Sequence, residues 1–202
     1  MIQIPALSLA IALATAPLAA LRADDITDQL DAARAAYQRG ELQASVRDLQ
    51  FVIGAIQEQI NLSLLKLLPE PLTGWTAEDP QATSGGVATM ITGTNLSRAY
   101  RRQDGAHLEI NLTANSPFLS MMTMMLSNPM MIQSDPNSRL YSYAGRRGVI
   151  RHDKDNGSLE INLVGSGNLL IRITGTGITK ADAEAYLQAM DLAAVEKAFG
   201  SA

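Results

Sequence analysis

The chain has 202 residues, of which 47% are hydrophobic, 18% charged and 4% aromatic, proportions typical of a globular protein rather than a disordered one. Its formal net charge is −4 at pH 7. Nucleic-acid bases stack on aromatic side chains, and because this chain has few of them, a nucleic-acid partner is disfavoured. The absence of cysteine excludes disulfides, cysteine nucleophiles and cysteine-ligated zinc.

Residues 1–23 resemble a secretory signal peptide. An apolar run of Ala, Leu and Ile is followed by small residues and a plausible cleavage point after Ala23 or Ala20. No Lys or Arg precedes the run, so a membrane-anchoring helix is the alternative, but Pro5, Pro17 and the short length favour a signal peptide. We therefore expect an exported, periplasmic protein with no transmembrane span after signal removal.

Residues 24–69 are predicted to form a helical hairpin. Thr27 or Asp28 is suited to cap the first helix, Gly40 breaks the pattern, and Pro69 follows the second helix. Apolar residues then recur at helical spacing through the second helix; they are Leu42, Val46, Leu49, Val52, Ile53, Ile56 and Ile60.

The middle of the chain is predicted to form β-hairpins. Trp75, the only tryptophan, opens this region and is expected to be a core anchor. The pentapeptide LEINL occurs twice, at 108–112 and 159–163, each time after a turn (QDG or KDNG) that follows a basic strand. Alternation sends the Leu and Ile residues of each copy to one face and the polar residues to the other. A further turn, VGSGN, leads into the strand LLIRIT.

Residues 116–133 hold six of the nine methionines, and no charged residue occurs between Ile110 and Ser134. Ser116 and Pro117 are suited to begin a helix there, and Pro129 to end it. A helix that is apolar over most of its circumference is either buried on several sides or exposes an apolar face.

Three interpretations of this methionine segment remain open. It fills irregular space in the core, it presents an adaptable contact surface, or its thioethers bind Cu(I). The first is the simplest, and the third lacks a nearby histidine. The candidate ligand-binding residues are Phe118, Met121, Met122, Met124, Met125, Met130 and Met131.

The charges are unevenly distributed. Residues 81–180 hold ten bases and six acids, whereas residues 181–202 hold four acids and one base. The simplest interpretation is that these charges form ordinary solvated faces. The alternative is that the basic middle faces an anionic partner or the acidic helices of the chain itself. The candidate anion-binding residues are Arg146, Arg147 and Arg151.

We predict no catalytic site, metal centre or cofactor. No G-x-S-x-G, H-E-x-x-H or P-loop motif is present. The two histidines, His107 and His152, are expected to be solvated surface residues. An enzyme would require one of them to lie within hydrogen-bond reach of a buried carboxylate.

A last helix is predicted from the cap Thr179 to Phe199. The order of elements is helix, helix, strands, helix, strands, helix, which predicts an α+β fold. Its parts are a signal peptide (1–23), a helical hairpin (24–69) and an antiparallel sheet with helices packed on it (70–202).

From Trp75 onward, the order of a Gly-Trp entry, hairpins, a middle helix, more strands and a C-terminal helix resembles that of PsbP-like sandwich proteins, over roughly residues 70–200. The chain also resembles bacterial exported proteins that pair such a domain with an N-terminal helical hairpin. These resemblances imply a binding or accessory role and transfer no site residues. We expect a non-enzymatic protein of the cell envelope that contacts a protein or an apolar ligand; the alternative is a periplasmic protein that handles Cu(I) or a small ligand through the methionine helix.

Overall fold

The computed structural model describes residues 23–83 and 95–200. Apart from Ala23, the predicted signal peptide lies outside the described residues. Within the described ranges, no helix combines the length and apolar character needed to cross a membrane. The chain divides into two compact units, Met1–Ala55 and Ile56–Ala202, and each is described by itself.

The predicted helical hairpin is confirmed, and the first unit holds its first helix and the start of its second helix. Helix α1 (Ala23–Gln38) contains Thr27 and Asp28, so the prediction that one of them caps it was wrong. A turn at Gly40, whose φ of 78° lies in the left-handed region, leads to α2 (Leu42–Leu65). Ile26, Val52 and Ala55 form a small buried cluster. Of the seven apolar residues that recur along α2, only Val52 is buried, and the other six are exposed.

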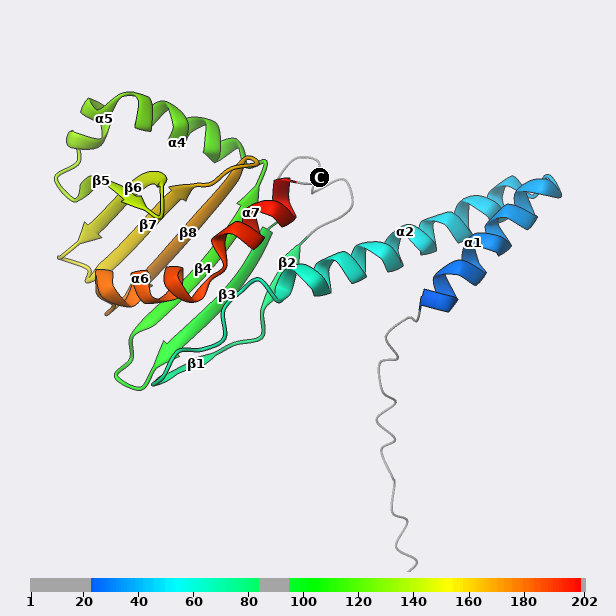
Figure 1. The fold of residues 1–202 in the computed structure, drawn as a ribbon, viewed down its shortest axis with the longest axis horizontal. Helices are drawn as coiled ribbons and strands as arrows, with labels where there is room; N and C mark the ends of the chain where they lie inside the picture. The colour runs from blue at the N-terminus through cyan, green and yellow to red at the C-terminus, as the bar shows by residue number, and fades with distance from the viewer. Residues whose placement is uncertain (1–22, 84–94, 201–202) are drawn as a thin grey trace, which may run out of the picture. The chain divides into compact units, whose positions relative to one another are not determined.

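The second unit is built on an antiparallel sheet of eight strands, which confirms the predicted α+β class (Figure 1). The strand order is β1-β3-β4-β8-β7-β6-β5, and β2 also pairs with β3. The strands are β1 (Trp75–Ala77), β2 (Gln81–Thr83), β3 (Asn95–Arg102), β4 (His107–Ala114), β5 (Ser138–Tyr143), β6 (Arg146–Asp153), β7 (Ser158–Val164) and β8 (Leu169–Thr176).

The two LEINL copies lie in β4 and β7, on either side of β8 and in the same register. Ile173 of β8 is opposite Ile110 of one copy and Ile161 of the other. All three side chains are fully buried. Both neighbours of β8 have one face on the apolar core and one face away from it. The same alternating pentapeptide therefore suits both positions.

Helices α6 (Lys180–Ala189) and α7 (Leu192–Gly200) cover one face of the sheet, here called the core face (Figure 1). Thr179 caps α6 as predicted, through a reciprocal capping box with Asp182. The prediction of one uninterrupted last helix was wrong. Met190 is extended, and the Asp191 carboxylate accepts a hydrogen bond of 2.9 Å from the Ala194 amide, so a new helix begins.

Three aromatic rings pack together at the β1 side of the core face. The rings of Trp75 and Tyr186 meet edge-on with centroids 5.5 Å apart, and Tyr100 lies 4.4 Å from Tyr186. The Tyr100 hydroxyl donates to the Pro69 carbonyl at 2.7 Å, and burial raises the pKa of this phenol above its ordinary value. Trp75 packs against the main core, as its predicted role as an anchor requires.

Helices α4 (Pro117–Ser127) and α5 (Pro129–Gln133) pack on the opposite face, here called the second face. Met122 belongs to a buried cluster that includes Val149 of β6. The next residue along the strand, Ile150, packs into the main core instead. Alternation along β6 therefore places α4 and α5 across the sheet from α6 and α7.

We expect Gly148→Ala to lower the free energy of unfolding by about 3 kcal/mol, because the new methyl group would collide with the backbone carbonyl of Asn162 in β7. Urea titration followed by Trp75 fluorescence measures this. Gly54→Ala in α2, followed by circular dichroism, is the control: beyond its chain neighbours and its own helix backbone, no atom lies within 4 Å of the new methyl group, so helix propensity should raise stability by up to about 1 kcal/mol. A tolerated Gly148→Ala would contradict the described pairing of β6 and β7.

Candidate functional site

The methionine segment is partly core and partly surface. On α4, Leu119, Met122 and Leu126 are buried. Five other apolar side chains are exposed, from 37% for Phe118 to 78% for Met130. These five define the methionine face: Phe118, Met121, Met124, Met130 and Met131.

Local sequence explains why this segment is helical and where it bends. The Ser116 hydroxyl accepts a hydrogen bond from the Phe118 amide at 3.2 Å, and Pro117 occupies the first turn. Pro129 then begins α5 after Asn128, whose amide donates to the carbonyls of Met124 and Met125. The predicted cap and helix boundaries are therefore confirmed.

Two of the candidate ligand-binding residues do not belong to the methionine face. Met122 is only 3% exposed and lies in the cluster with Leu126, Ile132 and Val149. Met125 is half-buried against the same cluster. These two side chains hold α4 on the sheet, since the second face is apolar at Val149 and Val164.

The hydroxyl side of α4, formed by Ser120, Thr123 and Ser127, borders two hollows of about 540 Å³ each. Thr123 lines both of them. The Thr123 and Ser127 hydroxyls donate to helix carbonyls one turn back, at 2.9 Å each. Their oxygens still have capacity to accept a hydrogen bond from a bound group.

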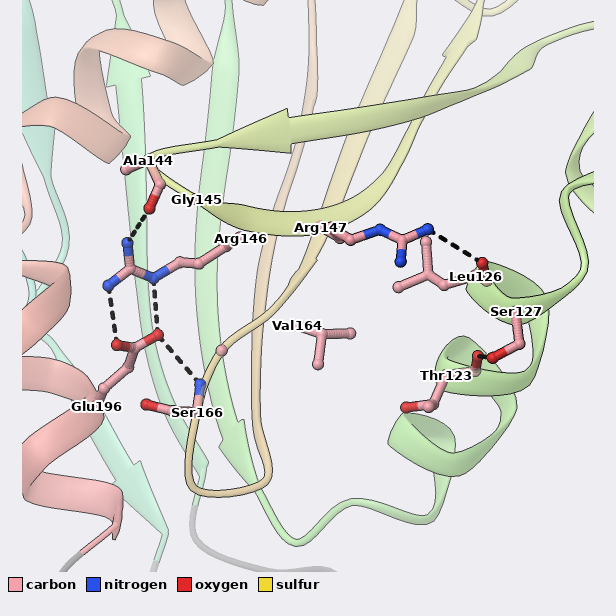
Figure 2. Close-up of a pocket in the computed structure, with 11 residues that line it drawn as sticks. Thr123, Leu126, Ser127, Ala144, Gly145, Arg146, Arg147, Val164, Ser166 and Glu196 are labelled. Carbon is pink, nitrogen blue, oxygen red and sulfur yellow. Dashed lines mark hydrogen bonds and ion pairs between the residues drawn. The ribbon is translucent and has the colours of Figure 1, made fainter.

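The first hollow is closed on one side by a pair of charges (Figure 2). Arg146, after the β5–β6 turn, donates to both carboxylate oxygens of Glu196 on α7, at 2.7 and 2.9 Å. Glu196 also accepts from the Ser166 amide in the β7–β8 turn at 3.1 Å. These bonds hold the pKa of Glu196 below its ordinary value, with the Arg146 hydrogen bond the largest cause.

The three candidate anion-binding arginines do not converge. Arg146 is paired with Glu196, whereas Arg147 extends in another direction and donates to the Leu126 carbonyl at 3.3 Å (Figure 2). Arg151 is paired with Asp135 at 3.3 Å. Strand alternation separates Arg146 from the other two, so the triplet forms no single anion-binding pocket.

Strained backbone gathers around the hollows. Among the described residues, the non-glycine residues with positive φ are Asn115, Asn168 and Ala144, at 58°, 56° and 47°. Asn115 and Asn168 line the second hollow, and Ala144 the first. Such conformations cost free energy and tend to cluster at functional positions. Sequence patterns gave no sign of these hollows, because their walls come from four distant segments.

The prediction that both histidines are solvated surface residues holds for His152 and is wrong for His107, which is half-buried. His107 lines a hollow of about 240 Å³ together with Glu109 and Glu160, but its buried Nδ1 has no hydrogen-bond partner. Glu160 is instead paired with Arg172 at 2.9 Å. His152 is exposed. The described residues also contain no group of three or more His, Cys, Asp or Glu side chains that would hold a metal ion.

Two substitutions on α4 separate its core residues from its surface residues. We expect Met122→Ser to lower the free energy of unfolding by about 3 kcal/mol, because it leaves a cavity and buries a hydroxyl. Met124→Ser, at a site 57% exposed, should change it by less than about 0.5 kcal/mol. Urea unfolding of both variants checks this, and equal losses would show that Met124 is also buried.

Glu196→Gln is expected to lower stability by about 2 kcal/mol at pH 7, because it weakens charge-assisted bonds to Arg146. Since the folded pKa lies below the ordinary value of 4.5, the contribution is complete above that pH and is lost as pH falls through the folded pKa. The difference between wild type and variant should therefore shrink below about pH 4.5 in denaturant titrations. Glu78→Gln, which removes an exposed pair with Arg101, should have little effect at any pH; an equal effect would contradict a special role for Glu196.

Comparison with protein-family models, curated proteins and solved structures finds no match to this chain. The likeness in element order to PsbP-like proteins therefore stays a prediction.

Proposed function

We propose that this chain is a non-enzymatic binding protein of the bacterial cell envelope, and that its methionine face contacts an apolar, uncharged segment of a partner protein. The observation that carries the proposal is the exposure of five large apolar side chains on two short consecutive helices. Met130 is 78% exposed and Met124 is 57% exposed. Isolated exposed apolar residues are ordinary, but a contiguous group points to a contact surface.

The composition of the face indicates the chemistry of its partner. No charged residue occurs between Ile110 and Ser134, so the face offers no ion pair to a charged segment. Thioether side chains are flexible and polarizable, and they adapt to apolar groups of irregular shape. The buried side of the same helix fixes the face in place, since Met122 and Leu126 pack against Val149.

The cellular location in the proposal rests on the sequence alone. The apolar run and small residues of positions 1–23 support export. Many exported proteins are stabilised by disulfides, which a chain without cysteine cannot form. Its apolar core must then supply the stability of the fold. The extensive core on β4, β7 and β8 supports that condition.

The test is site-specific photo-crosslinking in intact cells, with a benzophenone side chain at Met131. We expect a discrete cross-linked product that disappears in the Met121→Ser/Met124→Ser variant, because the partner loses its apolar contact. The matched control is Ser120→Ala/Ser127→Ala, which changes the hydroxyl side of the same helix and should retain the product. Circular dichroism checks that both variants remain folded.

A product that survives the double methionine change would overturn the proposed surface. A Cu(I) competition titration separates the metal-binding alternative. Tight Cu(I) binding by wild type that is lost in the same methionine variant, with no cross-linked product, would replace protein contact with metal handling.

A further inference from the structure

Helix α2 carries a second exposed apolar surface, of a different kind from the methionine face. Six apolar residues follow one another at spacings of alternately four and three. Their exposed fractions run from 41% for Ile56 to 57% for Leu42. A repeat averaging 3.5 residues is the pattern of a coiled-coil seam. The six residues, here called the heptad stripe, are Leu42, Val46, Leu49, Ile53, Ile56 and Ile60.

The hairpin itself does not use the heptad stripe. The buried residues of α2 in the first unit are Ser45, Val52 and Ala55, and Ile26 of α1 packs with the latter two. Ser45 and Val52 adjoin the stripe, and Ala55 lies farther round α2. Helix α1 therefore packs beside the stripe and leaves its six side chains exposed. An apolar stripe of this regularity on a continuous helix matches the surface of another helix.

The residue types along the stripe favour a two-stranded, parallel pairing. In heptad notation, the a positions are Val46, Ile53 and Ile60, all β-branched. The d positions are Leu42, Leu49 and Ile56. Parallel dimers are favoured over higher assemblies when side chains branched at Cβ occupy the a positions and Leu occupies most d positions.

The flanking positions of the stripe carry no charge. The e positions are Gln43, Gln50 and Gln57, and the g positions are Ser45, Val52 and Gln59, so none carries a charge. The charged residues of this stretch, Arg47, Asp48 and Glu58, fall at positions b, c and f, away from the seam. Identical charges at e and g positions would repel each other in a dimer of two identical helices. Because these positions are uncharged, two copies can meet without that repulsion.

We propose that the chain forms a parallel dimer through α2, with the heptad stripe of one copy packed against the same stripe of a second copy. The heptad stripe and the methionine face share no residue.

Sedimentation velocity of the purified chain over a range of concentrations tests the dimer. We expect a monomer–dimer equilibrium in wild type. Ile53→Glu should weaken the dimer at least about 100-fold, because it places two carboxylates against each other at position a. Phe51→Glu is the matched control: it adds the same charge at a site 48% exposed but lies off the seam, and it should leave the dimer intact.

The lack of native cysteine allows the direction of pairing to be tested. In a parallel dimer, Val46→Cys lies opposite its own copy and should form an intermolecular disulfide on mild oxidation. Phe51→Cys, off the seam, should not. A wild-type monomer at all concentrations, a trimer or larger assembly, equal effects of Ile53→Glu and Phe51→Glu, or a dimer that Val46→Cys does not cross-link would each overturn the proposal.

Discussion

The structure depends on the burial of strand β8 between two copies of the same pentapeptide. Ile171 and Ile173 are completely buried, and both neighbouring strands place Leu or Ile beside them. With both hydrogen-bonding edges of β8 occupied, α6 and α7 need to cover only one face. The other face of β8 is polar at Arg172 and Thr174 and apolar at Leu170, which lies opposite Val164 of β7. Val149 and Val164 on this face pack in the cluster that holds α4. The methionine helix lies where that change in polarity permits it.

Arginine–carboxylate pairs link the helices and loops to this sheet. Arg102 is paired with Asp182 of α6 at 2.7 Å, and Arg146 with Glu196 of α7 at 2.7 Å. Both pairs are partly shielded from solvent, which makes them stronger than exposed pairs. The basic middle of the sequence is therefore neutralised in part by the acidic C-terminal helices. This was one of the interpretations that the charge distribution left open.

The two exposed apolar surfaces differ in regularity, and this difference indicates different partners. The heptad stripe has a fixed period and β-branched side chains with few rotamers, which suits one regular partner helix. The methionine face has no comparable period, and its side chains have many rotamers, which suits a less regular surface. Dimerisation through α2 would also place two methionine faces in one assembly, so that a partner with two matching segments would bind with increased avidity.

The sequence by itself determined the α+β class, the helical hairpin, both LEINL hairpins, the caps Ser116 and Thr179, and the limits of the methionine helix. These features depend on interactions among residues near one another in the chain, such as a side chain that caps an amide three residues away. The tertiary structure alone decided that β8 lies between the LEINL copies, that Met122 is buried while Met124 is exposed, and that Arg146 pairs with Glu196. It also decided that the hollows lie along the hydroxyl side of α4. These features arise from contacts between distant segments, and a helix apolar on most sides carries no local signal of which side the sheet will cover.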